Sequence, residues 1–279
     1  MKKICGLMCV LMMMAVFGVS QSYARRRASY KPMPVRSNVD IPNGEYIMYS
    51  IYVGGEKAME FRMVTTYTDK TLVKTYMDLH MIGEDIKVPD HYTKYPWYAK
   101  VNLETASMTR YVQDETHYYV DQNLKKGIHF MDVSFGNEIR AVTRTWDGYE
   151  SRQSISRSRN VDISYPVWLM AGFNLWGSRL LNWEEGGVVY IWDSYLKDPV
   201  LSSMNILGRD TLKSDIGMFE VDKIGFRVAD PFLGALLRQF TDSITFWVER
   251  GPKRRLLKIE IEAGDQTWIM EDYKILAVD

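Results

Sequence analysis

The chain has 279 residues, 46% of them hydrophobic, and its 35 basic and 35 acidic side chains give a formal net charge of zero. This balance gives no indication of a nucleic-acid partner, and the hydrophobic content is ample for a core. Both cysteines, Cys5 and Cys9, lie near the N-terminus, so the rest of the chain can form no internal disulfide and holds no thiol nucleophile or cysteine metal site.

Residues 1–24 have the features of a cleavable secretory signal. Lys2 and Lys3 begin it, residues 4–19 are almost wholly apolar, and small residues around Ala24 suit a signal peptidase. The apolar run, about sixteen residues, is shorter than the roughly twenty that cross a bilayer as a helix. We therefore expect an exported protein with no transmembrane segment in its mature chain. The periplasm is the expected location, and the outer membrane or the outside of the cell are the alternatives.

The sequence after the signal divides into a leader and one domain. Residues 25–40 are basic at first and then polar with prolines, which predicts a flexible leader. Residues 41–279 show no linker-like composition, so we expect a single β-rich domain. Cleavage after Ala24 removes Lys2 and Lys3 and leaves a formal net charge of −2.

Alternating β-branched and aromatic residues dominate the first half of the domain and predict a series of short antiparallel strands. Gly54 and Gly55 predict a hairpin turn between the first two. Pro89 and Pro96 mark an irregular stretch. The predicted strands are 45–53, 58–67, 71–81, 97–101, 107–114, 117–122, 127–135, 139–146 and 149–156.

The alternation breaks at Ser164, which is the predicted N-cap of a helix over 164–182 with Pro166 in its first turn. Apolar residues cover nearly every face of this helix, so we expect it to be buried in the concavity of a curved sheet. A second, shorter helix is predicted at 228–240, and it could be a lid, a partner surface or core. The remaining predicted strands are 187–194, 200–207, 218–226, 243–249, 254–262 and 266–276.

The second half of the chain resembles an exported bacterial family, domain-of-unknown-function family 3108, because three features occur in the same order in both. They are the aromatic helix at 165–182, a hairpin pair ending in a glycine element, and a closing strand pair. The resemblance covers most of residues 44–276, although Leu256 and Leu257 stand where the family usually has a proline and the helix at 228–240 is additional. The hairpin pair is 188–193 with 204–208, its glycine element is 216–221, and the closing pair is 244–248 with 254–260.

The resemblance implies an architecture similar to that of the envelope lipoprotein carriers. The expected fold is therefore mainly β: a large curved antiparallel sheet, or half-barrel, that wraps one or two helices and leaves an apolar cavity. The family supplies no established catalytic residues, and a likeness of architecture is weak support for a function.

Residues that could carry chemistry are scattered. The four histidines, His80, His91, His117 and His129, form no metal-ligand pattern, and structural roles are favoured for each. Asp90 and His91 share a turn-rich loop and are the one pair with some catalytic potential. The chain contains no nucleophile-elbow, phosphate-loop or dinucleotide motif. We expect a protein that is not an enzyme and has no metal site or cofactor.

Two functional hypotheses follow. In the first, Trp168, Phe173, Trp176 and Leu180 line a cavity that binds a lipid or other hydrophobic ligand, although aromatic residues at helical spacing are more often core. In the second, the protein is a structural or interaction module of the cell envelope. It would hold no ligand and would bind another envelope protein through exposed sheet edges or the helix at 228–240.

Overall fold

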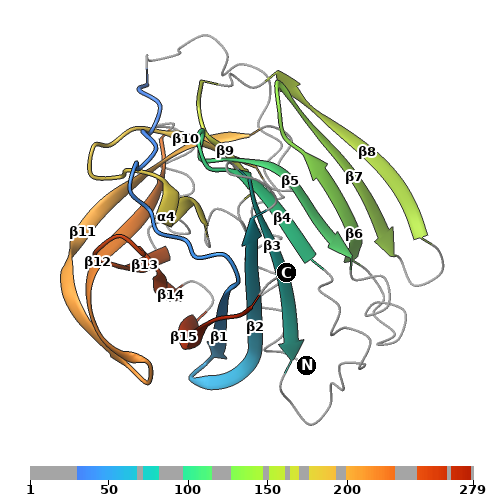
Figure 1. Ribbon diagram of the computed structural model, residues 1–279. Coiled ribbons are helices and arrows are strands. Elements are labelled where there is room, and N and C mark those ends of the chain that lie inside the picture. Colours follow the sequence, from blue (N-terminus) through green and yellow to red (C-terminus); the bar gives the residue numbers. More distant parts are fainter. Residues whose placement is uncertain are drawn as a thin grey trace.

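The structure is a computed structural model that describes residues 30–67, 72–81, 97–114, 127–146, 151–160, 164–169, 176–192, 199–229, 244–262 and 265–277. Fifteen strands in one sheet dominate it (Figure 1). Several predictions lie outside the described residues. They concern the signal, residues 25–29 of the leader, the strand at 117–122 and residues 230–240 of the second helix.

Hydrophobic alternation located most strands correctly, and the bounds of two of them agree with the prediction at both ends. The strands of the first half are β1 (Glu45–Val53), β2 (Glu56–Tyr67), β3 (Leu72–Met81), β4 (Trp97–Asn102), β5 (Ser107–Asp114), β6 (Gly127–Ser134), β7 (Glu138–Trp146) and β8 (Ser151–Asn160). Those of the second half are β9 (Val167–Leu169), β10 (Val189–Trp192), β11 (Val200–Ser214), β12 (Gly217–Val228), β13 (Ile244–Glu249), β14 (Leu256–Ile261) and β15 (Gln266–Ile275).

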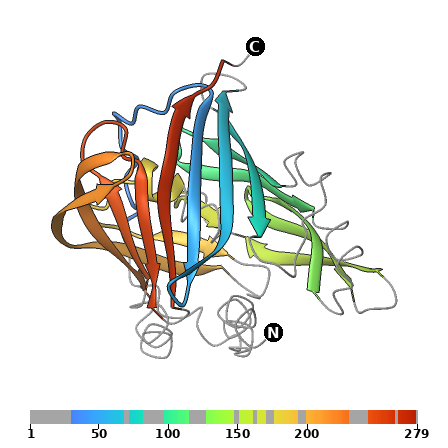
Figure 2. The same ribbon diagram turned by 90° about the horizontal axis from the view of Figure 1, so that it is seen from below.

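The strands join in the order β8-β7-β6-β5-β4-β3-β2-β1-β15-β14-β13-β12-β11-β10-β9, so β8 and β9 are the edges and the sheet stays open. Neighbouring strands are antiparallel except for β9 and β10, which are parallel. The sheet curves strongly (Figure 2). Its β9 edge returns to contact β5. The predicted class, mainly β with a large curved antiparallel sheet, is confirmed.

The period-two pattern of β1 shows how the sequence sets the two faces of the sheet. Ile47, Tyr49 and Ile51 are each 1% exposed and belong to the hydrophobic core. The turn after β1 is the predicted hairpin, and Gly54 and Gly55 both have positive φ values, of 61° and 80°.

The predicted continuous helix over 164–182 is wrong. Its described part contains the strand β9 and only a three-residue helix, α4 (Ser178–Leu180). The carbonyl of Pro166 accepts a hydrogen bond from the N–H of Tyr190 at 2.8 Å, so pairing with β10 begins directly after the proline. A run that is apolar on every face suits a strand buried on both faces as well as a buried helix, and periodicity cannot separate the two.

The leader prediction is also wrong for residues 30–40, which are packed. Met33 is 1% exposed, and its N–H donates to the carbonyl of Val188 at 2.9 Å. The N–H of Arg36 donates to the carbonyl of Leu180 at 2.8 Å. This segment runs beside the turn between α4 and β10, because its alternating apolar residues find a buried surface there despite the two prolines.

Two boundaries in the second half differ from the prediction. β11 continues to Ser214, well beyond residue 207, because a bulge between Ile206 and Gly208 keeps it paired with β12. Val228, expected to start the second helix, is the last residue of β12. The resulting β11–β12 hairpin exposes Leu207 and Met218 at 53% and 71%.

A polar cluster on β1, β2 and β15 links three neighbouring strands in the middle of the sheet. The carboxylate of Glu271 accepts hydrogen bonds from Tyr52 Oη at 2.8 Å and Lys57 Nζ at 3.2 Å, and from Ser50 Oγ. Burial acts to raise the pKa of Glu271, but these three donors outweigh it and hold the pKa below its ordinary value.

Replacing Glu271 with glutamine is expected to lower the free energy of unfolding by about 1–2 kcal/mol at pH 7, because donors to a charged acceptor lose part of their hydrogen-bond energy. The pKa of Glu271 is lower in the folded protein than in the unfolded chain. Its stabilisation of the folded state is therefore complete above the pKa of the unfolded chain and disappears as the pH falls through the pKa of the folded protein. Urea unfolding should show that the difference in free energy of unfolding between wild type and Glu271→Gln is smaller at pH 3 than at pH 7. Asp272→Asn is the control, because Asp272 forms a more exposed pair with Lys274. If Glu271→Gln loses the same free energy of unfolding at both pH values, the charged carboxylate of Glu271 does not have the stabilising role given to it.

Candidate functional site

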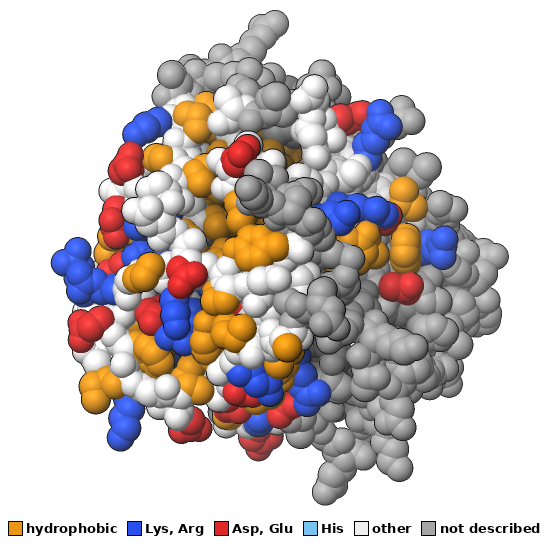
Figure 3. Space-filling view, in the orientation of Figure 1, with side chains coloured by type: hydrophobic (Ala, Val, Ile, Leu, Met, Phe, Trp, Pro, Cys, Tyr) orange, Lys and Arg blue, Asp and Glu red, His pale blue; other side chains and the backbone are white. Residues whose placement is uncertain are grey.

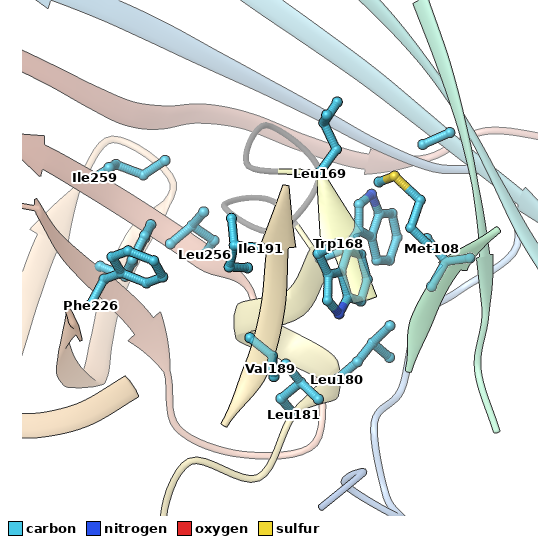
Figure 4. Packing of buried hydrophobic residues seen from close by; sticks show 14 of the residues in the cluster. Met108, Trp168, Leu169, Leu180, Leu181, Val189, Ile191, Phe226, Leu256 and Ile259 are labelled. Atoms are coloured by element: carbon cyan, nitrogen blue, oxygen red, sulfur yellow. The ribbon is translucent and has the colours of Figure 1, made fainter. Parts of the chain in front are cut away.

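The structure brings three of the four predicted cavity residues into one buried cluster. Trp168 and Trp176 are 0% exposed and Leu180 is 3% exposed. Figure 4 shows Trp168 and Leu180 packed among apolar side chains of β5, β9, β10 and α4. Phe173, the fourth, lies outside the described residues.

The curl of the sheet positions this cluster. β9 lies inside the curve, between its partner β10 and the start of β5, where the N–H of Val167 donates to Ser107 Oγ at 3.3 Å. All three residues of β9 are buried, which requires packing on both of its faces. Trp192 of β10 meets the ring of Phe135 edge-on at a centroid distance of 6.5 Å.

A buried ion pair lies within this apolar interior. Arg179 of α4 is 1% exposed and Glu45 of β1 is 0% exposed. Arg179 NH1 and NH2 donate to the two oxygens of Glu45 at 2.6 and 3.1 Å. Arg179 Nε and NH2 also donate to the carbonyl of Lys253, at 3.2 and 2.9 Å. Every guanidinium nitrogen is therefore engaged, and the pair joins β1, α4 and the turn before β14.

This ion pair suits a structural role better than an acid–base role. Both Glu45 oxygens accept hydrogen bonds from Arg179, and the carboxylate is fully buried. Tyr49, next to it on the same face of β1, donates to the carbonyl of Leu256 at 2.7 Å. Burial raises the pKa of Tyr49 above its ordinary value, so the phenol stays protonated at neutral pH.

Sequence reasoning missed this pair, although one signal was available. Glu45 is in phase with Ile47, Tyr49 and Ile51, and a charged residue in phase with a buried face needs a buried partner. The partner could not be named from sequence, because Arg179 lies in a segment expected to be a continuous helix.

Three tryptophans of the core have buried Nε1–H groups for which the described residues supply no hydrogen-bond acceptor. They are Trp176, Trp183 and Trp192. The Arg179 guanidinium lies over the Trp176 ring, 5.2 Å from its centroid. Buried polar groups are nearly always paired, so each of these donors needs an explanation.

Other predicted features are only partly placed. Asp90 and His91 lie outside the described residues. Within the described ranges, no group of three or more His, Cys, Asp or Glu side chains is arranged to hold a metal ion. No helix in those same ranges has the length and apolar character needed to cross a membrane.

No family model matches the chain, and no curated protein sequence matches it. Among solved structures, it is similar to a protein with a YmcC-like fold from Bacteroides fragilis, with 8% identity, a TM-score of 0.32, and coverage of 85% of this chain and 98% of that one. It is also similar to a β-barrel-like protein of domain-of-unknown-function family DUF1849 from Brucella abortus, with 9% identity, a TM-score of 0.35, and coverage of 84% and 98%. These TM-scores are low, and we infer nothing about this chain from them. The resemblance to family 3108 gains no support.

Proposed function

We propose that the protein is a non-enzymatic, exported binding protein that holds a hydrophobic or lipid-like ligand inside the curve of its sheet. Export rests on the signal features of residues 1–24, and the periplasm is the proposed location. The binding site is the aromatic interior around Trp168, Trp176 and Leu180.

The unpaired indole donors carry this proposal. A buried N–H without an acceptor costs about 1–3 kcal/mol, so a stable protein seldom leaves one unused. Trp176 and Trp192 each present such a donor in the core, Trp176 beside the guanidinium of Arg179. A lipid supplies what both lack, because its acyl chain fits the apolar residues and its ester or amide carbonyl accepts the N–H. The ligand class is therefore an apolar chain that carries a carbonyl group.

Native mass spectrometry of protein purified from the periplasm, followed by lipid extraction, tests the proposal. One lipid per chain is expected on a protein that begins at Arg25. Trp176→Phe keeps an aromatic ring but removes the donor, so it should weaken the binding of a dansyl-labelled fatty acid about five- to tenfold, the value of one hydrogen bond. Trp247→Phe is the matched control, since the Trp247 indole donates to Glu260 at 3.3 Å.

A lipid-free mass together with no dansyl-fatty-acid binding overturns the proposal, as does equal binding by the two tryptophan variants. That result favours the second hypothesis, an interaction module without a ligand. Its surface would include the edge of β11, which has β12 as its only described partner strand beyond Ser202.

A further inference from the structure

A second place in the fold combines a cleft with a buried, incompletely paired cation. The cleft has a volume of about 450 Å³ and lies between residues 35–38, the turn after α4 and the turn before β14. Arg36, Asn38, Asn182 and Arg254 contribute to its lining. Over the described face in Figure 3, basic and acidic side chains lie interspersed, so any preference for an anion must come from local geometry.

Arg254 is the central residue of this site. Its side chain is 5% exposed, and its backbone has a positive φ of 49°, which a non-glycine residue adopts only when its surroundings hold it there. Nε and NH2 of Arg254 are buried, and none of the described residues forms a hydrogen bond with them. Its NH1 lies 3.5 Å from Asp222 Oδ2 and 3.8 Å from Glu184 Oε1.

Other arginines of this protein show what the Nε–NH2 edge binds. Arg110 uses Nε and NH2 to bind both oxygens of Asp132, at 3.1 and 2.7 Å. Arg255 uses the same edge for both oxygens of Glu249, at 2.7 and 2.8 Å. This fork matches the spacing of two oxygens on a carboxylate or a phosphate. No carboxylate of the described ranges is hydrogen-bonded to the equivalent edge of Arg254.

Arg36 provides a second cation on the cleft. The Arg36 and Arg254 guanidinium groups both lie over the ring of Trp183, at 5.1 and 4.3 Å from its centroid. Arg36 NH2 donates to Asn182 Oδ1 at 3.2 Å, and Arg36 Nε is buried with no hydrogen-bond partner in the part of the chain that the structure describes. The Trp183 ring therefore contacts two like charges, and Oε1 of the 46% exposed Glu184 lies 3.7 Å from Arg36 NH2 and 3.8 Å from Arg254 NH1.

The carboxylates nearby do not balance these cations. Asp222 is 2% exposed and is shared by three guanidinium groups at 3.5 to 3.8 Å, those of Arg209, Arg250 and Arg254. Glu184 is 46% exposed and lies 3.7 Å from Arg36. Burial, and then the charge of Arg36, lower the pKa of Arg254 to about 10, so the residue is charged at neutral pH at an energetic cost.

We propose that this cleft is an oxyanion-binding site in which the Nε–NH2 edge of Arg254, assisted by Arg36 and Asn182, binds one carboxylate or phosphate group of a ligand. The site is separate from the aromatic interior of the proposed function and does not depend on it. Glu185 on its rim, 57% exposed, disfavours ligands with a second negative charge on that side.

Isothermal titration of the mature protein with inorganic phosphate and with acetate tests the site, with sodium chloride at matched ionic strength as the baseline. We expect saturable binding of at least one of the two anions. Arg36→Gln and Arg254→Lys should each weaken it at least about tenfold, the latter because lysine keeps the charge but lacks the fork. Arg110→Gln, which breaks an exposed fork elsewhere, should leave binding unchanged.

The two anions distinguish the ligand chemistry. Binding of phosphate alone indicates a phosphate ester, binding of acetate alone indicates a carboxylate ligand, and binding of both supports the shared site. Circular dichroism checks that each variant is folded. If Arg254→Lys does not fold, Arg36→Gln decides, because the Arg36 side chain is 18% exposed and less constrained. No binding above the chloride baseline, or equal binding by wild type and Arg36→Gln, overturns the proposal.

Discussion

Replacing Arg179 with methionine is expected to lower the free energy of unfolding by about 3–5 kcal/mol, because the change leaves the carboxylate of Glu45 buried without its cation. Arg179 and Glu45 are 1% and 0% exposed, and water cannot reach the carboxylate without local opening. The carbonyl of Lys253 also loses both of its Arg179 donors. Urea unfolding followed by circular dichroism measures the loss.

A matched control separates burial from geometry. Arg110 and Asp132 form a fork with similar distances, but their side chains are 45% and 29% exposed. Arg110→Met is therefore expected to cost only about 0–1 kcal/mol. The double variant Glu45→Gln with Arg179→Met should lose less than the sum of its single variants, because no isolated charge remains buried. A similar cost for Arg179→Met and Arg110→Met contradicts the role given to the buried pair.

The strands were predictable because each has its own local signal. β1 and β5 agree with the predicted bounds at both ends. In β1 the apolar residues alternate between a buried face and a more exposed one, whereas in β5 the buried residues Met108 and Tyr111 are three positions apart, because the register with β4 shifts between them. The hairpin at Gly54 and Gly55 was predictable for the same reason, since both glycines adopt the positive φ that the turn requires. Such signals need only neighbouring residues.

The errors arise where local sequence is compatible with two structures. Residues 166–169 are apolar on every face, and only the pairing of 167–169 with β10 shows that they form a strand. Residues 30–40 look like a leader because of their prolines, yet their backbone groups form hydrogen bonds with residues between 180 and 188 and with Pro252. Local sequence could not indicate the cleft around Arg254 either. Residues 36, 182 and 254 are far apart in the sequence, and the strand order of the sheet brings them together.

Replacing Gly187 with alanine is expected to release residues 30–40 and to lower the free energy of unfolding by about 3 kcal/mol, the upper end of the cost of one strained residue. Gly187 has φ of 132°, which other residues avoid. A Cβ atom there would lie 2.6 Å from Met33 Cα and 2.8 Å from the carbonyl oxygen of Pro32. Both are backbone positions, so a change of rotamer cannot relieve the clash, and the segment itself must move away.

Limited trypsin digestion measures this release, because cleavage after Arg36 requires the packed segment to open. The Arg36 side chain is 18% exposed in the packed state, and its N–H is bonded to the carbonyl of Leu180. Gly187→Ala should therefore be cleaved there faster than wild type. Gly136→Ala, at a glycine with open space around its Cβ position, should not. Since Arg36 also lines the cleft beside Arg254, the released variant should lose oxyanion binding as well, which would link the packed segment to the proposed site. Equal cleavage rates in the two glycine variants would show that residues 30–40 are not held against the turn between α4 and β10.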